Sequence, residues 1–330
     1  MQNLPLVTIV IPTHNAADTI GIALSSALNQ TYRNVEVIIV DDGSTDGTRR
    51  IVEAYEDERV RLIAKAQGGA ASARNAGLRA ATGDLVAFLD DDDYLFPDYL
   101  TEAFACLRPG KWFVTSNAYF LYASGISPRH LRHRQPIPGP GAQRLSLLRY
   151  NWLSIMSLFP RSMLQDVEEF DESLRRSEDW EFWLQAVYSG WRVTLQPKPL
   201  AMINRSQISQ SSSRHEVASA ENQILQKFSS RDDLTPEEQR CLQHRLLVPH
   251  AGMASQSAHD ALAAGDYRTA GKLFRSAVHY GPPSTALRLK AAGLTVAPRF
   301  AGPLLRRRHL AVVAAGLTDP YLDDDSAGAG

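Results

Sequence analysis

Four short apolar runs in the first 90 residues constrain the fold of this chain more than any other feature. Each of the first three runs is followed by a segment in which apolar residues recur with helical spacing. This alternation is typical of parallel strands that crossover helices bury on both faces. We therefore predict an α/β fold with a doubly wound, mostly parallel sheet. The expected strands are residues 6–11, 35–40, 60–64 and 85–89, and the expected helices are residues 16–29, 45–55 and 70–81.

The chain beyond residue 111 has a different pattern, which predicts further strands, one long mobile loop and a helical C-terminal region. Residues 206–213 include five serines and are typical of a linker. Residues 261–282 have the spacing of one tetratricopeptide-like hairpin. We expect strands at 112–122 and 191–195, the loop at 124–141, mixed structure at 145–163, and helices at 178–188, 216–228, 236–264, 267–280 and 284–292.

The composition is that of an ordinary globular protein, with 44% hydrophobic and 22% charged residues. A formal net charge of −1 gives no bulk field toward nucleic acid, so we expect none as a partner. The two cysteines, Cys106 and Cys241, have no metal-ligand or redox spacing and fit a reducing compartment. The N-terminus reads as a strand rather than a signal peptide, and no apolar run has the length of a membrane span. Together these features predict a cytoplasmic protein.

Four consecutive carboxylates, Asp90 to Asp93, follow the fourth expected strand directly and form the most specific motif in the chain. Ligands of doubly wound sheets bind beyond the carboxyl ends of the strands, which is where these acids lie. Two like charges 4 Å apart repel by about 1 kcal/mol even in water, and hard ions such as Mg²⁺ take carboxylate and phosphate oxygens. The segment therefore predicts a divalent metal site. The alternative is a solvated acidic turn before a helix that begins near Pro97.

A glycine-rich turn precedes the third expected helix, with Gly68 and Gly69 at its start and Arg74 one turn inside the helix. Backbone N–H groups at a helix N-terminus, together with a guanidinium group, suit a diphosphate. Because glycine-rich turns are common, the turn alone is a weak indication of a diphosphate site, and Arg74 makes the motif more specific.

Three further polar segments follow strands or begin a helix. Asn15 or Asp18 can cap the helix after the first strand. One acid of Asp41-Asp42, after the second strand, can accept hydrogen bonds from a base or ribose. The pair Glu178-Asp179 begins an amphipathic helix, where acids interact favourably with the helix dipole. A carboxylate beside aromatic surface is also suited to act as a general base.

These residues together resemble family 2 of the glycosyltransferases, the inverting family with the GT-A fold. The resemblance covers residues 5 to 205, while the helical region beyond resembles only an appendage of some members. We expect a GT-A domain over residues 1–213, a helical region over 214–310 and a flexible tail over 311–330. The matching segments, in the family's order and approximate spacing, are Pro12-Thr13-His14-Asn15, Asp41-Asp42-Gly43-Ser44-Thr45-Asp46, Ala73-Arg74-Asn75-Ala76-Gly77, Asp90-Asp91-Asp92-Asp93 and Glu178-Asp179.

The resemblance implies where a nucleotide-diphosphate sugar binds. His14 and Asp42 are expected to flank the nucleobase, which is most often uridine in this family, and Arg74 is expected to approach the diphosphate. The residues expected at the nucleotide sugar are Pro12, His14, Asn15, Asp42, Gly69, Arg74, Asp90 and Asp91.

The resemblance also implies the metal ligands and the catalytic base. Asp90 and Asp92 match the metal-binding Asp-x-Asp, with Asp92 as the primary ligand of Mg²⁺ or Mn²⁺. Asp179 matches the catalytic base, and Glu178 has a supporting role. Some members offer a downstream histidine to the metal or phosphates, whereas this chain has Asn204-Arg205 there. How the diphosphate is held on that side stays open at this point.

The implied reaction is sugar transfer with inversion, to a hydroxyl of a glycan or lipid-linked glycan acceptor in polysaccharide biosynthesis. Two alternatives are a metal-dependent nucleotidyltransferase, which would need a lysine or second arginine in the glycine-rich turn, and a non-catalytic nucleotide-binding scaffold. For a lipid-linked acceptor, the segment with Arg299, Arg306, Arg307 and Arg308 can contact an anionic membrane through its basic and apolar residues. The alternative for that segment is a solvated helix end packed on the catalytic domain.

Overall fold

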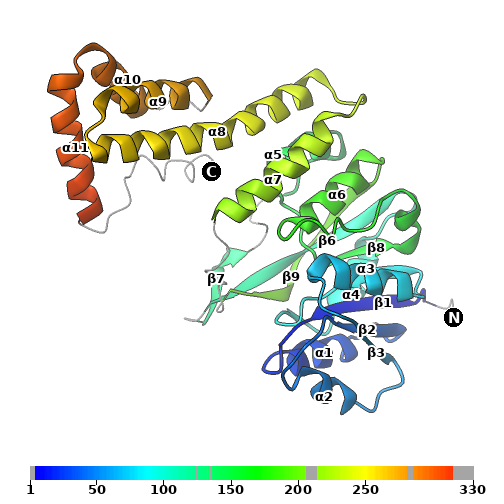
Figure 1. The fold of residues 1–330 in the computed structure, drawn as a ribbon. Helices are drawn as coiled ribbons and strands as arrows, with labels where there is room; N and C mark the ends of the chain where they lie inside the picture. The colour runs from blue at the N-terminus through cyan, green and yellow to red at the C-terminus, as the bar shows by residue number, and fades with distance from the viewer. Residues whose placement is uncertain are drawn as a thin grey trace. The chain divides into compact units, whose positions relative to one another are not determined.

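A computed structural model of the chain describes residues 4–122, 125–131, 133, 136–205, 214–280 and 285–314. The chain divides into two compact units, Met1–Ile224 and Leu225–Gly330, whose folds are drawn in Figure 1. This division falls inside helix α7 (Arg214–Ser229), beyond the boundary that we expected at residue 213. The expected linker at 206–213 lies outside the described residues.

The first unit is built on one mixed sheet with the strand order β3-β2-β1-β4-β8-β6-β9-β5, in which β7 also pairs with β6. Strands β3, β2, β1 and β4 are parallel, as predicted, and β6 is parallel to β9. Strand β8 is antiparallel to both of its neighbours, β4 and β6. The strands are β1 (Val7–Thr13), β2 (Val35–Asp41), β3 (Val60–Ala64), β4 (Leu85–Phe88), β5 (Tyr94–Leu95), β6 (Trp112–Tyr122), β7 (Gly125–Leu131), β8 (Ser157–Pro160) and β9 (Arg192–Asn204).

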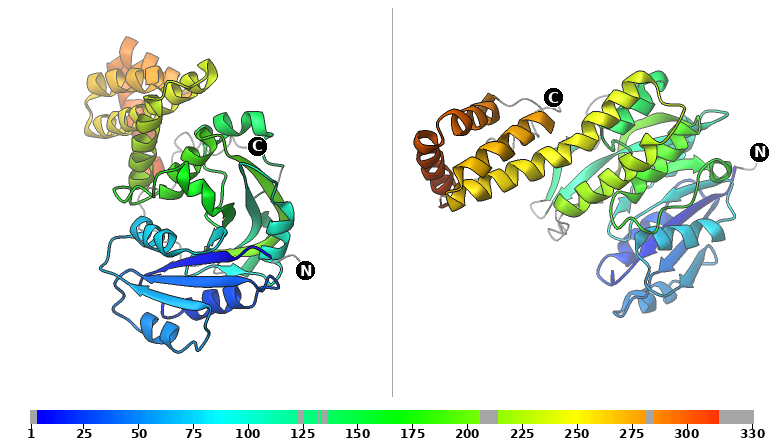
Figure 2. Two further views of the ribbon diagram at one scale, coloured as in Figure 1. Left: turned by 90° about the vertical axis from the view of Figure 1, so that its right-hand side faces the viewer. Right: turned by 45° about the horizontal axis from the view of Figure 1, so that its top comes forward.

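Helices cover both faces of this sheet. As a result, every residue of the central strand β1 is buried. Val7, Ile9 and Ile11 pack on one face into a core that includes residues of α1 (Ile20–Leu28) and α4 (Tyr99–Cys106). Figures 1 and 2 place α3 (Ala70–Ala80) on one side of the parallel strands and α1 with α2 (Thr48–Glu53) on the other. The doubly wound arrangement predicted from the alternating pattern is therefore confirmed.

Helix α3 approaches β1 most closely at Gly77. A Cβ atom built on Gly77 would lie 2.3 Å from Cγ1 of Val10, so only glycine fits between this helix and this strand. Residue 74 lies one turn earlier on the same face of the helix. The close contact at Gly77 therefore determines how deeply residue 74 is placed.

Two segments of the first unit differ from the expectation. Residues 125–131 fall within the expected loop but form β7, which pairs with β6 in the register Leu121 opposite Ile126. Strand β9 has 13 residues and continues well beyond the expected end at 195, because it pairs along β6 and then with β5. In both cases the element forms by pairing with another strand, which is β6 for β7, and β6 and then β5 for β9. The region of mixed structure expected at 145–163 forms α5 (Gln143–Arg149), β8 and the 3₁₀ turn η2 (Arg161–Gln165), and a short 3₁₀ turn η1 (Pro140–Ala142) precedes α5. The helix expected at 178–188 is α6 (Glu178–Tyr188).

The second unit is helical, and its first helix has clear start and stop signals. Thr235 and Glu238 form a capping box with Pro236 at the first helical position, and Gly265, with φ 85°, ends the helix. Helix α11 extends into the expected flexible tail, of which residues 311–314 are helical and the rest lies outside the described residues. None of the described helices has the length and apolarity of a membrane span. The helices are α8 (Pro236–Ala264), α9 (Tyr267–Tyr280), α10 (Thr285–Val296) and α11 (Pro298–Ala314).

Candidate functional site

The acidic segment that follows β4 is fixed to two other parts of the sheet. The backbone N–H of His14, just after β1, donates to Oδ2 of Asp91 at 3.2 Å. The backbone N–H of Asn204, the last residue of β9, donates to Oδ1 of Asp93 at 2.8 Å. Asp93 is buried, whereas Asp92 is exposed. The carboxylates of Asp91 and Asp93 therefore hold the loop in place, whereas those of Asp90 and Asp92 take no part in these two hydrogen bonds.

The carboxylates of this segment are energetically strained against one another. Burial raises the pKa of Asp91 and, more strongly, that of Asp93. Although part of Asp92 is exposed, desolvation by the surrounding protein, with repulsion from Asp90 and Asp91, raises the pKa of Asp92 to about 6. Attraction to Arg205 works in the opposite direction and lowers the pKa of both Asp92 and Asp93. A cation bound here would relieve the same repulsion.

Arg74 joins the acidic segment to the acidic pair at the start of α6. Its guanidinium donates from Nη2 to Oδ1 of Asp90 at 2.8 Å and from Nη1 to Oε1 of Glu178 at 2.6 Å. The side chain is buried, with its Cζ 5.8 Å from the ring centroid of Phe170. Burial lowers the pKa of Arg74, but the two carboxylates outweigh burial and hold the pKa above its usual value. Two motifs that are far apart in the sequence thus meet at one guanidinium.

Asp179 is held by the start of α6 and by one residue that sequence reasoning missed. Its Oδ2 accepts from Nδ2 of Asn151 at 3.0 Å, and its Oδ1 accepts from the backbone N–H of Trp180 at 2.8 Å. The buried indole of Trp180 anchors the helix by donating to the carbonyl of Leu147. A half-buried carboxylate in a fixed orientation, one residue from Glu178, is suited to accept a proton.

The turn before α3 is occupied by a side chain of the protein itself. The backbone N–H groups of Gly68 and Gly69 donate to the carboxylate of Asp42, at 2.9 and 2.7 Å. Nζ of Lys65 lies 2.6 Å from Oδ1 of the same carboxylate. The N–H groups that the sequence assigned to a diphosphate are therefore engaged by Asp42, which is itself buried. Lys65, which precedes the glycine-rich turn, was missed because its contact with Asp42 depends on the folded sheet.

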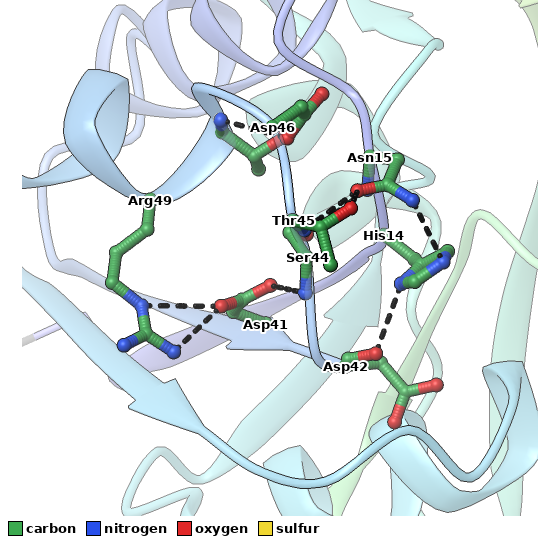
Figure 3. Close-up of polar contacts among 9 residues, drawn as sticks. His14, Asn15, Asp41, Asp42, Ser44, Thr45, Asp46 and Arg49 are labelled. Carbon is green, nitrogen blue, oxygen red and sulfur yellow. Dashed lines mark hydrogen bonds and ion pairs between the residues drawn. The ribbon is translucent and has the colours of Figure 1, made fainter.

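His14 and Asn15 lie at the same edge of the sheet and connect the loops that follow β1 and β2 (Figure 3). Nδ1 of His14 donates to the carbonyl of Asp42 at 2.9 Å, because a carbonyl can only accept. Nε2 is then an acceptor for the amide groups of Asn15 and Gln67, at 3.0 and 3.1 Å. Three polar side chains and the carbonyl of Asp42 are thus gathered where the nucleobase was expected.

Asn15 does not cap the following helix. Its backbone is left-handed, with φ 53°, and its Oδ1 accepts from the backbone N–H of Thr45. The N-cap position of α1 is Thr19, and its side chain makes no capping hydrogen bond. Pro12 is buried within β1, opposite Val40. In the structure Pro12 thus packs within the sheet.

The donor set fits a divalent cation only with help from a ligand. Among the residues that the structure describes, no three His, Cys, Asp or Glu side chains are arranged to hold a metal ion. Mg²⁺ is commonly bound by one or two carboxylates, with the remaining positions filled by water and substrate phosphates. Asp90 and Asp92 suit that arrangement, because a bound cation would relieve the repulsion that helps to raise the pKa values of Asp91 and Asp92.

Comparison with known proteins gives a consistent result. Residues 8–163 match the sequence profile of glycosyl transferase family 2. The chain is 35% identical over 208 residues to the succinoglycan biosynthesis protein ExoO of Rhizobium meliloti (strain 1021), covering 60% of each protein. It is 40% identical over 119 residues to UDP-Glc:alpha-D-GlcNAc-diphosphoundecaprenol beta-1,3-glucosyltransferase WfaP of Escherichia coli, covering 36% of this chain and 47% of that protein. The chain thus spans about half to three fifths of the length of these two relatives.

A solved structure has the same fold. TarS 1-349 of S. aureus in complex with UDP-GlcNAc matches with a TM-score of 0.58 at 18% identity, over 95% of this chain and 93% of that one. At this identity the likeness concerns the fold alone.

Proposed function

We propose that this chain is an inverting glycosyltransferase of polysaccharide biosynthesis, on the premise that residues 8–163 match the sequence profile of glycosyl transferase family 2. The observation that carries this proposal is the bridge from Arg74 to Asp90 and Glu178. It brings the segment suited to a metal-bound diphosphate next to the residue suited to act as a base, Asp179. A transfer between a donor phosphate ester and an acceptor hydroxyl needs these two functions side by side.

We infer that the donor is a UDP-sugar and the acceptor a glycan or lipid-linked glycan. The inference is supported by the name of WfaP, which contains a UDP-sugar and a diphosphoundecaprenol, and by the UDP-GlcNAc in the TarS complex. The nucleobase would lie against His14, with the amide groups of Asn15 and Gln67 beside it.

The metal, when bound by Asp90 and Asp92, would offset the negative charge that develops on the leaving diphosphate. The oxygen of the acceptor hydroxyl attacks the anomeric carbon from the face opposite the leaving diphosphate, while Asp179 takes the proton of that hydroxyl. The bond from the anomeric carbon to the diphosphate breaks, and the configuration inverts. Arg74 keeps Asp90 and Glu178 in fixed positions and adds positive charge beside them. Asn151 orients the carboxylate of Asp179.

The rival reaction, nucleotidyl transfer, expects a second cation at the glycine-rich turn. Lys65 is such a cation, but its ammonium group is bound to the carboxylate of Asp42 and to the carbonyl of Ala66, at 2.6 and 2.7 Å. The positive charge of Lys65 is therefore largely offset within the protein. This arrangement favours sugar transfer, in which the metal and Arg74 carry the charge compensation.

The test is a screen of UDP-, GDP- and dTDP-sugars, with and without Mg²⁺ or Mn²⁺, in which released nucleoside diphosphate is measured. We expect one donor class to be cleaved in a metal-dependent manner, and Asp92→Ala to abolish this cleavage while the variant remains folded. Release of pyrophosphate from nucleoside triphosphates, with no cleavage of any nucleotide sugar, would instead establish nucleotidyl transfer.

A further inference from the structure

The charges of the chain are unevenly distributed. The whole chain contains 35 Lys and Arg against 36 Asp and Glu. The segment from Tyr267 to Thr318 contains nine Lys and Arg and neither Asp nor Glu. The neutral total charge therefore conceals a strongly basic segment, which covers α9, α10 and α11. Such a segment attracts an anionic partner through its local field.

Helix α11 presents apolar and basic side chains together on one face. Phe300, Leu304 and Arg307 follow at intervals of four and three residues, so they lie along one side of the helix. Phe300 is 85% exposed and Leu304 is 71% exposed. The adjoining side of the helix is used within the unit, where Ala301 and Leu305 pack on its core.

The exposed apolar side chains are concentrated in this region. Among the residues whose exposure the structure describes, nine large apolar side chains are exposed, and five of these lie between residues 289 and 310. Single exposed apolar residues are ordinary, but a group of them marks an interaction surface. Besides Phe300 and Leu304, the group includes Val296 at 84% exposure, the last residue of α10. Arg299 and Arg308 are exposed beside the same face.

We propose that the surface formed by Val296, at the end of α10, and by Arg299, Phe300, Leu304, Arg307 and Arg308 of α11 docks on an anionic lipid surface. A helix with large apolar groups and arginines on one face lies in the membrane interface, with the apolar groups among the acyl chains and the arginines at the headgroups. A nucleic acid would use the arginines but would leave Phe300 and Leu304 in water. The proposal concerns binding alone, so it can hold or fail independently of the transferase reaction.

The experiment is co-sedimentation of the full chain with vesicles of phosphatidylcholine, with or without phosphatidylglycerol, at low and high salt. We expect binding to vesicles with phosphatidylglycerol that weakens as salt rises. The double variant Phe300→Ser/Leu304→Ser should bind at least about tenfold more weakly, since each side chain loses a large apolar burial. Arg307→Gln/Arg308→Gln should bind about 25-fold more weakly, because each arginine near an anionic surface contributes about fivefold.

Two matched controls keep the test specific. Arg268→Gln/Lys272→Gln removes two exposed cations from α9, and Ile22→Ser removes an apolar side chain that is 59% exposed in the first unit. Both variants should lose far less vesicle binding than the two α11 variants, and circular dichroism should give every variant the wild-type helix content. Absence of vesicle binding by the wild type would overturn the proposal. Binding that needs Arg307 and Arg308 but is unchanged in Phe300→Ser/Leu304→Ser would overturn it too, and would indicate a soluble polyanion.

Discussion

Glu178→Gln tests whether the bridge through Arg74 contributes to the stability of the first unit. The substitution keeps the size of the side chain and one hydrogen-bond acceptor, but it removes the negative charge that faces Nη1 of Arg74 at 2.6 Å. In the pair, the Arg74 side chain is 6% exposed and the Glu178 side chain is 14% exposed, so water cannot replace the lost partner. Asp90 still neutralises the guanidinium group.

The expected loss follows from the kind of hydrogen bond that is exchanged. A hydrogen bond to a charged group contributes about 1.5–3 kcal/mol. The pair with two charges lies toward the upper end of this range and the bond from the guanidinium to the new amide toward the lower end, so the variant should lose about 1–2 kcal/mol. Removal of one whole partner from a buried pair costs about 3–5 kcal/mol, and we expect less because Asp90 remains. For a unit of this size the loss corresponds to a fall in Tm of about 2–8 °C.

Tryptophan fluorescence during urea unfolding measures this loss in the correct unit. All five tryptophans of the chain lie within Met1–Ile224, so their signal follows the first unit even if the two units unfold separately. Glu169→Gln is the matched control. Its partner Arg79 and Glu169 itself are 54% and 52% exposed, and such pairs contribute a few tenths of a kcal/mol. If Glu178→Gln and Glu169→Gln change the free energy of unfolding equally, the bridge is not the stabilising contact described here.

Three further predictions concern the site itself. Asp179→Asn should lower turnover by about 10²-fold or more while calorimetry gives nearly unchanged donor affinity, because an amide cannot accept the acceptor's proton; parallel loss of both would assign Asp179 to donor binding. In metal-free buffer the raised pKa of Asp92, about 6, should make its contribution to stability largest below about pH 4 and lost as pH rises through 6. Asp92→Asn should therefore be more stable than the wild type at pH 7 and no more stable at pH 4, as measured by urea unfolding, and a constant difference would refute the assignment. Arg205→Gln should weaken binding of UDP with Mg²⁺ by about tenfold in calorimetry, with partial recovery in Arg205→Lys, because the positive charge of Arg205 acts on Asp92 and would also attract a phosphate bound there; an unchanged affinity would exclude that role.

The elements that the sequence predicted well have their signals within a few residues. Strands β3 and β6 and helices α6, α8 and α9 have the expected bounds, since apolar periodicity and local caps such as the Thr235–Glu238 box specify them. Strand β7 and the second half of β9 have no such local signal. They form because a neighbouring strand offers unpaired backbone groups, and that information depends on the register of β6.

The candidate site was predictable to a similar extent. Its positions follow from the rule that ligands bind beyond the carboxyl ends of parallel strands, and the structure gathers His14, Asp42, Arg74 and Asp90 at that edge. The partners of these residues were not predictable. Asp42 takes the N–H groups of the glycine-rich turn, and Asn151 reaches Asp179 from a segment without any motif.

The close contact between α3 and β1 limits which sequences can support this chemistry. Replacing glycine by alanine within a helix ordinarily stabilises a protein by about 1 kcal/mol, and a stability design would select Gly77 for that change. Here the added methyl group would meet Val10 at 2.3 Å, so the helix would have to move outward by about 1–2 Å to reach an ordinary contact distance. Arg74 would move with it, and a displacement of about 1 Å in catalytic machinery can cost about 10²-fold in rate. Gly77, which has no functional group, thus determines how precisely Arg74 is positioned. A substitution at Gly77 that stabilises the helix should therefore lower turnover.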